Sequence, residues 1–168
     1  MNLQTERFEL RTLDPAVDDF SAYLSWMRNA KSNPYIRGIK SDMTLEELRD
    51  YVLDKNNSRE AILLGIFHRI STQHIGNVKL EPILANEYAF VGILIGEESW
   101  RGKGAGFEVL SEILDFCFSV IDLKELMLGV DFTNHAAYKL YRKLGFREIK
   151  EQSDTTLKML LKRSTITK

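Results

Sequence analysis

The chain alternates between two spacings of apolar residues, and each spacing predicts one kind of element. Short alternating or continuous apolar segments predict strands, whereas apolar residues three or four positions apart predict helices. Strands are expected over residues 7–13, 61–70, 74–83, 88–95, 126–130, 146–151 and 155–162. Helices are expected over residues 17–30, 44–56, 107–121 and 134–144. The predicted order is βααβββαβαββ, which indicates an α/β fold with a mixed sheet (α+β).

Two of the predicted strands are apolar at nearly every position. Residues 88–95 and 126–130 have this pattern, which is typical of strands that are covered on both faces. We therefore expect both strands in the middle of the sheet. The predicted helix between them makes this segment a strand–helix–strand unit, and such units form right-handed parallel crossovers.

Residues with known capping preferences mark several helix ends. Thr44 and Glu47 form a capping-box pattern before the second helix. Asn134 is a typical N-cap for the last helix, and Gly145 is a typical left-handed stop after it. The dipeptide at 33–34, Asn-Pro, ends the first helix.

The composition is that of an ordinary globular protein and excludes several classes. The 168 residues include 23 Lys and Arg against 24 Asp and Glu, and 44% of them are hydrophobic. Because neither a linker nor a repeat interrupts this length, we expect one domain over 1–168, with 164–168 as a loose tail. The net charge of −1 gives no bulk attraction to nucleic acid or to an anionic membrane, so neither is expected as a partner.

Targeting and metal signals are not found in the sequence. The first residues lack a basic stretch followed by an apolar one, and no segment reaches about 18 consecutive apolar residues. A cytoplasmic location is therefore expected. The single cysteine, Cys117, excludes an internal disulfide and a Cys-rich zinc site, and it is expected as a buried apolar residue in a helix. No metal is expected.

Three glycines gather between a predicted buried strand and a long helix. Gly102, Gly104 and Gly106 lie within five residues, interleaved with Arg101, Lys103 and Ala105. Glycine lets the backbone adopt positive φ and approach a ligand closely, and the start of the following helix presents free N–H groups to an anion. The segment predicts a phosphate-binding turn, and the alternative is a tight turn that binds nothing.

Two common nucleotide motifs do not fit this turn. A P-loop requires Lys followed by Ser or Thr after its last glycine, but Phe107 and Glu108 follow Gly106. A dinucleotide fingerprint that starts at Gly102 would end on Phe107, and Asp122 ends a helix instead of a second strand. A nucleotide-binding protein of either kind is therefore a distant alternative.

Two signatures resemble those of one enzyme family. Arg101, Gly104 and Gly106 fit R-x-x-G-x-G, which resembles the acetyl-coenzyme A pyrophosphate loop of the GNAT superfamily of N-acetyltransferases. Residues 134–146 match the family's N-x-x-A-x-x-x-Y-x-K-x-G-F signature at every fixed position. The expected helix and strand separate the two signatures. The resemblance is sharpest from about 88 to 147, and it implies a GNAT fold with splayed central parallel strands.

The resemblance also implies a cofactor and its binding residues. The pyrophosphate of acetyl-CoA is expected on the backbone amides of Arg101, Gly102, Lys103, Gly104, Ala105 and Gly106. The pantetheine arm is expected beside Ile93, Leu94 and Ile95, where it would pair like a short extra strand, and Asn134 would contact the same arm. In similar enzymes a main-chain amide of that strand polarises the thioester carbonyl.

Tyr141 is the expected general acid and a cofactor-binding residue. A phenol with a pKa of about 10 keeps its proton at neutral pH and can give it to a departing thiolate. The alternative is that Tyr141 only packs with Ala137 and Leu144 on the inner face of the helix.

The general base is not visible in the sequence. Related ribosomal-protein N-terminal acetyltransferases often have a glutamate shortly before the position of Gly92, where this chain has Ala89, Phe90 and Val91. Glu81, His74 and Asp131 are possible substitutes, and a water chain or an amine that arrives neutral is an equal alternative.

The acceptor is expected to be a primary amine. Trp26, Tyr35 and Arg37 lie in the region that forms acceptor sites in this superfamily, although aromatic residues at helical spacing are usually core. Residues 75–83 look like a segment of GNAT members that acetylate amino groups on nucleotide-linked sugars, which favours a small molecule such as an amino sugar. The opening of the chain resembles the ribosomal-protein branch, so a protein N-terminus is the alternative. A non-catalytic coenzyme A-binding module is a further hypothesis, and no sequence feature indicates the oligomeric state.

Overall fold

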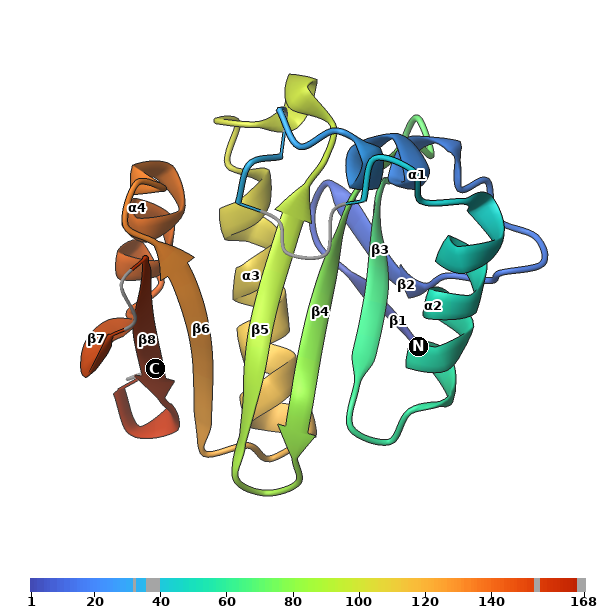
Figure 1. Cartoon of the computed structure of the whole chain (residues 1–168). Helices are drawn as coiled ribbons and strands as arrows, with labels where there is room; N and C mark the ends of the chain where they lie inside the picture. Colours follow the sequence, from blue (N-terminus) through green and yellow to red (C-terminus); the bar gives the residue numbers. More distant parts are fainter. Residues whose placement is uncertain (32, 36–39, 153–154, 166–168) are drawn as a thin grey trace.

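The predicted strands combine into one mixed sheet in the computed structural model, which describes residues 1–31, 33–35, 40–152 and 155–165 (Figure 1). The eight strands are β1 (Asn2–Gln4), β2 (Phe8–Thr12), β3 (Ile62–His68), β4 (His74–Leu84), β5 (Tyr88–Ile95), β6 (Glu125–Asp131), β7 (Arg147–Gln152) and β8 (Thr156–Lys162). Their order in the sheet is β1-β2-β3-β4-β5-β6-β8-β7. The predicted mixed α/β fold is confirmed.

Helices cover both faces of the sheet. They are α1 (Ser21–Arg28), α2 (Leu45–Asn57), α3 (Ala105–Asp115) and α4 (His135–Lys143). A π-helical segment, η2 (Phe116–Val120), continues α3, and η1 (Glu98–Trp100) and η3 (Arg163–Thr165) are short 3-10 helices. In Figure 1, α3 lies behind the sheet, and α1 and α2 lie over its β3 side. The predicted caps are present: Thr44 and Glu47 form a capping box, and Asn134 caps α4.

The core consists of two apolar clusters, one on each face of the sheet. The larger cluster joins the sheet to α3 and includes Val91, Val109, Leu128 and Phe146. The smaller cluster joins α1 and α2 to β3 and includes Tyr23, Trp26, Leu48, Val52 and Leu63. Cys117 is fully buried in the larger cluster, as predicted, and burial raises the pKa of its thiol to about 12.

The central parallel strands separate soon after they pair. β5 and β6 pair at three positions, Tyr88 with Glu125, Ala89 with Leu126 and Phe90 with Met127. Beyond Phe90, β5 continues to Ile95 without pairing to β6, while its other edge stays paired to β4. Figure 1 shows the two strands diverging toward the end of β5. The expected parallel crossover and its splayed strands are both confirmed.

Three details differ from the sequence-based expectations. β1 is an additional strand that is too short to show a periodicity. α1 begins at Ser21 instead of residue 17, because the bidentate ion pair of Arg11 with Asp18 holds the preceding turn and leaves Val17 81% exposed. β5 is central, but its two faces differ: Ala89 and Val91 on one face are buried, whereas on the other face Leu94 is only half-buried and Gly92 is exposed.

Candidate active site

The glycine-rich turn connects the end of β5 to the start of α3. Gly102 and Gly104 have φ of +71° and +79°, which few residues other than glycine adopt without strain. Gly104 is the N-cap of α3, and within the described part of the chain no side chain caps this end. The first N–H groups of α3 are therefore available to an anion, as the sequence predicts for a phosphate-binding turn.

The third glycine of the turn has a different role. Gly106 lies inside α3, and a Cβ atom there would stand 3.1 Å from the Leu140 side chain of α4. Its small size thus permits the close packing of the two helices. Lys143 of α4 also approaches α3, with its Nζ 4.2 Å from the centre of the Phe107 ring.

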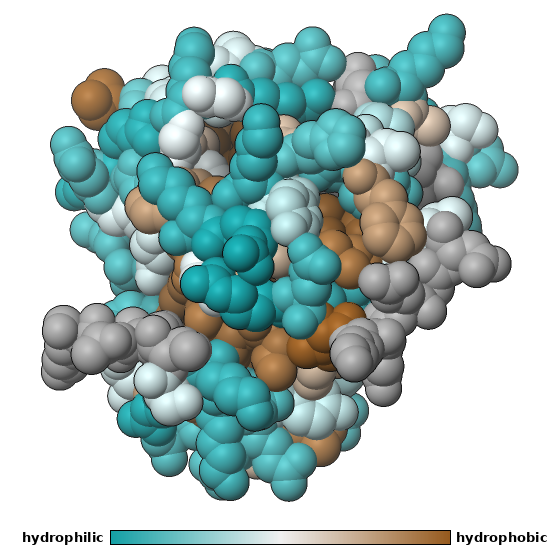
Figure 2. Space-filling view, turned by 90° about the vertical axis from the view of Figure 1, so that its left-hand side faces the viewer, coloured by the Kyte–Doolittle hydropathy of each residue, from teal (hydrophilic) through white to brown (hydrophobic). Residues whose placement is uncertain are grey.

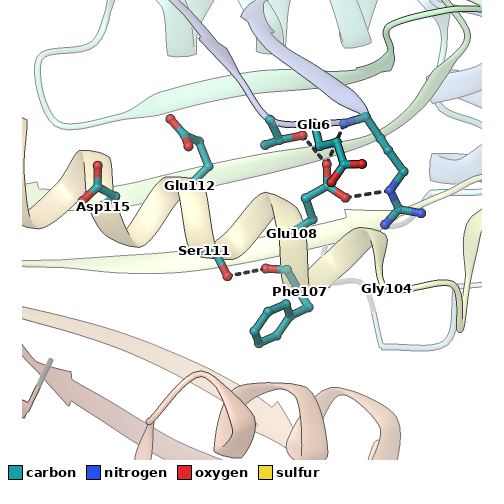
Figure 3. Close-up of a pocket in the computed structure, with 9 residues that line it drawn as sticks. Glu6, Gly104, Phe107, Glu108, Ser111, Glu112 and Asp115 are labelled. Carbon is teal, nitrogen blue, oxygen red and sulfur yellow. Dashed lines mark hydrogen bonds and ion pairs between the residues drawn. The ribbon is translucent and has the colours of Figure 1, made fainter. Parts of the chain in front are cut away.

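A hydrogen-bond network supports the turn from behind. The carboxylate of Glu108 accepts hydrogen bonds from the Thr5 hydroxyl at 2.6 Å, the Arg7 backbone N–H at 2.8 Å and Arg7 Nε at 2.7 Å. Arg7 Nη1 also donates to the Lys103 carbonyl at 3.1 Å. Figure 3 shows Glu108 leaving α3 toward the segment around Glu6, whereas Phe107 points toward α4. This network joins residues about one hundred positions apart, and nothing in the sequence indicates it.

The network also sets the charge state of Glu108. Burial on its own would raise the pKa of this carboxyl group. The hydrogen bonds from Thr5 and Arg7 outweigh burial, so the pKa lies below its ordinary value. The side chain therefore stays ionised and keeps its hold on Arg7 at neutral pH.

The Arg101 guanidinium is held at the end of β5 instead of at the first N–H groups of α3. Its Nε donates to the Ile95 carbonyl at 2.9 Å, and its Nη2 donates to Gly96 O at 3.1 Å and to Asn33 Oδ1 at 2.7 Å. The side chain thus braces the end of β5 and ties it to the segment after α1. Lys103, the other cation of the turn, is exposed to solvent.

The open edge of β5 leads from the splay point to this turn. Ile93, Leu94 and Ile95 are half-buried, and they pair with Val78, Asn77 and Gly76 of β4. Because the opposite edge is not paired to β6, its backbone groups can pair with an extended amide-bearing chain. Figure 2 shows that apolar side chains reach the surface in a hollow, bordered by hydrophilic ones, on the side of the molecule that carries α4.

Tyr141 and Asn134 both belong to α4. Tyr141 is 8% exposed, its ring packs edge-on against Phe146, and burial raises the pKa of its phenol to about 12. Among the described residues its hydroxyl has no hydrogen-bond partner, and the oxygen is not completely buried. Asn134 Oδ1 accepts the Ala137 N–H at 3.1 Å, which leaves the Nδ2 group for a ligand.

Comparison with known proteins identifies the family. Residues 7–147 match a family model described as "Acetyltransferase (GNAT) domain". The chain belongs to the GNAT acetyltransferase family. This confirms the predicted family, the assignment as an acetyl-CoA-dependent N-acetyltransferase and acetyl-CoA as the acetyl donor.

Solved structures with this fold superpose over nearly the whole chain. A GNAT-family acetyltransferase from Bacillus anthracis has a TM-score of 0.82 and 15% identity, and covers 98% of this chain and 99% of its own. A spermidine N-acetyltransferase from Vibrio cholerae, in complex with CoA and spermine, has a TM-score of 0.82 and 20% identity, with coverages of 95% and 97%. A ribosomal alpha-N-protein acetyltransferase in complex with coenzyme A has a TM-score of 0.81 and 16% identity, with coverages of 96% and 98%. At these identities the likeness shows a shared GNAT fold.

The three candidate general bases of this GNAT protein are already engaged. Glu81 accepts from Lys55 and Lys79, and these contacts outweigh burial and lower its pKa. Asp131 accepts both the N–H and the hydroxyl of Thr133, which lowers its pKa. His74 is held mostly buried beside Phe67 and Trp26, and burial lowers its pKa, so it is neutral at pH 7. None of the three is an evident base, and the alternatives of a water chain or a neutral amine stay open.

The residues expected near the acceptor have different environments. Trp26 is buried, and a Cβ on Gly96 would stand 2.1 Å from its ring, so Trp26 is part of the packing beside the end of β5. Tyr35 is 45% exposed, and its hydroxyl lies 3.4 Å from the carbonyl and the hydroxyl of Thr133. Tyr35 therefore reaches across to the residues that follow β6. Arg37 lies outside the described residues.

The described residues contain neither a candidate metal cluster nor a candidate membrane-spanning helix. No group of three or more His, Cys, Asp and Glu side chains there is arranged to hold a metal ion. No helix in the same residues has the length and apolar character to cross a membrane.

Proposed function

We propose that this GNAT protein acetylates a primary amine by direct attack of the amine on the thioester of acetyl-CoA, with Tyr141 as the proton donor. The observation that carries the proposal is the open edge of β5, which runs from the splay point at Phe90 to the positive-φ glycine turn. The edge suits the amide groups of a pantetheine arm, and the turn suits a pyrophosphate. A Cβ atom added to Gly102 would meet no atom within 4 Å, and one added to Gly104 would meet only Arg7 Nη2, at 3.6 Å.

The residues of the chain would divide the binding and the proton transfer between them. When bound, acetyl-CoA supplies the activated carbonyl carbon. The backbone N–H groups of 102–106 would hold the pyrophosphate, and Ile93, Leu94 and Ile95 would position the arm. The amine nitrogen forms a bond to the carbonyl carbon, the C–S bond breaks, and the ammonium proton leaves to solvent.

The environment of Tyr141 refines its expected part in this reaction. A phenol with a pKa of about 12 is a weaker acid than a thiol with a pKa of about 8.5. The phenol thus keeps its proton and would donate a hydrogen bond to the sulfur while negative charge develops there. Tyr141 would then act as a relay: its phenol would give its proton to the thiolate while it takes up another proton from solvent.

We propose a small-molecule amine, such as an amino sugar, as the acceptor. The resemblance of residues 75–83 to sugar-acetylating members supports it. The alternative is a protein N-terminus, which the shared fold with a ribosomal alpha-N-protein acetyltransferase favours. The cytoplasmic location and the absence of a nucleic-acid partner stay predictions.

The test measures cofactor binding and turnover separately. Acetyl-CoA at a hundredfold excess over Kd should stabilise the protein by about 2.7 kcal/mol in thermal unfolding. Release of free thiol is then followed over amino sugars, nucleotide-linked amino sugars, polyamines and N-terminal peptides. No stabilisation at millimolar acetyl-CoA would contradict the proposal, and stabilisation without turnover on any amine would favour the non-catalytic coenzyme A-binding module.

A further inference from the structure

A row of polar side chains runs along β4 on the face that α1 and α2 cover. Residue 75 forms a bulge in this strand, since Gly76 pairs with Ile66 while His74 pairs with Phe67. His74, Asn77 and Lys79 consequently share one face, and Lys79 Nζ lies 5.9 Å from the ring of Tyr51 in α2. The row lies beside β5, where Asn77 pairs with Leu94 and Lys79 pairs with Gly92.

Gly92 opens this face at the splay point. It is exposed, and a Cβ atom added to it would meet no atom within 4 Å. It lies two residues beyond Phe90, the last residue of β5 that pairs with β6. Directly paired residues of neighbouring strands have Cα atoms about 4.5–5.5 Å apart, so Lys79 stands at the edge of this opening.

Two ammonium groups share one carboxylate beside the opening. Lys79 and Lys55 each place Nζ 2.8 Å from the carboxylate of Glu81, which the two ammonium groups share. Lys55 also contacts Asp54, whose side chain is 72% exposed and is therefore strongly screened by solvent. The Lys79 side chain is 38% exposed, so it can give up part of its contact with Glu81 to meet a ligand.

Asn77 adds an unused donor to the same row. It is 5% exposed, and its Oδ1 lies 3.0 Å from His74 Nε2, which also lies 2.9 Å from the Gly76 carbonyl. With two acceptors beside it, Nε2 carries the proton of this imidazole. Asn77 Nδ2 is buried and has no partner among the described residues, which is unusual for a buried amide. Lys79 and Asn77 therefore offer an ammonium and an amide N–H two residues apart on one face.

We propose that Lys79 and Asn77 bind an oxyanion of the acceptor, a phosphate or a carboxylate, so that the acceptor is an amine with an anionic group. This inference rests on the proposed acetyltransferase function and assigns the substrate class of the same site. A polyamine would instead meet two ammonium groups whose shared carboxylate, Glu81, is already engaged. Like charges in such proximity disfavour binding, and an oxyanion would supply the missing acceptor.

The experiment compares matched pairs of amines that differ only in the anionic group. Glucosamine 6-phosphate is compared with glucosamine, and alanine with alaninamide, while spermidine is the cationic reference. Each is assayed by thiol release with acetyl-CoA, and its binding is measured by thermal shift in the presence of coenzyme A. The variant is Lys79→Gln, and Lys124→Gln is the control because Lys124 is exposed at the far end of the sheet, before β6.

The inference requires a preference that depends on Lys79. The wild-type protein should favour the anionic member of at least one pair, and Lys79→Gln should reduce that preference about tenfold or more through KM, with kcat and the acetyl-CoA thermal shift unchanged. Lys124→Gln should keep the preference. The phosphate pair and the carboxylate pair separate the two possible oxyanions.

Three outcomes would each overturn the proposed oxyanion site. They are equal kcat/KM within both pairs, a preference for spermidine, and an anion preference that survives Lys79→Gln. If thiol release fails with every amine, the proposed function is wrong, but Lys79-dependent binding of the anionic member would still support the oxyanion site. Equal binding of both members in that case would overturn the site as well.

Discussion

The proposed donor side and the proposed acceptor side of this GNAT protein are built in different ways. The proposed donor side, formed by the open edge of β5 and the turn at 101–106, offers mainly backbone groups whose direction depends on Gly102 and Gly104. The proposed acceptor side, the row on β4 with Gly92, offers the side chains of Asn77 and Lys79. Backbone groups recognise what all members of a cofactor class share, whereas side chains can differ between relatives with the same fold. Under the proposed function, selection of the acceptor therefore lies with the side chains of β4, and the backbone of the turn serves the cofactor.

The largest expected effect would break the donor side alone. Gly104→Val places a β-branched residue at φ +79°, where such residues are strongly disfavoured, so the turn should lose its shape. The stabilisation of about 2.7 kcal/mol by a hundredfold excess of acetyl-CoA should disappear in thermal unfolding. Gly104→Asn is the matched control, because Asn tolerates this conformation and a Cβ there would lie 3.6 Å from Arg7 Nη2, an ordinary contact. An unchanged thermal shift in the valine variant would contradict the assignment of the turn.

The next effect concerns the chemical step between the two sides. Tyr141→Phe should lower kcat by roughly 10² and leave acetyl-CoA affinity nearly unchanged, because it removes only the proton donor. Tyr138→Phe serves as the control on the same helix, since the Tyr138 hydroxyl already donates a hydrogen bond to Glu148. Steady-state thiol release measures both variants. Full activity of Tyr141→Phe would leave Tyr141 with only its packing against Phe146.

A moderate effect is expected from the support behind the turn. Glu108→Ala removes three hydrogen bonds to a charged group, so the free energy of unfolding should fall by about 2 kcal/mol in chemical denaturation. Acetyl-CoA should also bind several-fold more weakly, because Arg7 no longer holds the Lys103 carbonyl. Glu112→Ala, one turn further along α3, should change stability by less than about 0.5 kcal/mol.

The pH dependence of this difference follows from the lowered pKa of Glu108. The carboxyl group has a lower pKa in the folded than in the unfolded chain, so its contribution is complete above its ordinary value of 4.5. The contribution is lost as the pH falls through the folded-state pKa. The stability difference between the wild type and Glu108→Ala should hence shrink in acid. A difference that grows in acid would contradict the network.

The smallest effect should separate the two sides most cleanly. Gly92→Ala adds a methyl group to open space on the acceptor face, and no atom within 4 Å opposes it. The acetyl-CoA thermal shift should be unchanged, whereas the KM of the preferred amine should change several-fold because the opening is smaller. A loss of cofactor binding with an unchanged acceptor KM would reverse the assignment of this face.

Features that depend on a local sequence pattern could be predicted from the chain alone. The capping box at Thr44 and Glu47, the N-cap at Asn134 and the positive φ of Gly145 follow from preferences of single residues, and all three are present. The same holds for the parallel unit of β5, α3 and β6, since apolar periodicity and chain connectivity together leave few arrangements. Two features could not be predicted in this way. β1 is too short to show a periodicity, and tertiary contacts in the preceding turn place the start of α1 at Ser21 instead of residue 17.

The chain by itself thus determined the family, the strand and helix order, and the glycine turn, because these depend on residue types at short spacings. Only the tertiary structure decided that Arg101 braces the end of β5, that Arg7 and Glu108 join across 101 positions, and that Lys79 stands beside Gly92. Such contacts depend on strand register and on helix packing, which arise from the summed burial of many side chains. They cannot be read from any one segment, and the proposed selection of the acceptor rests on them.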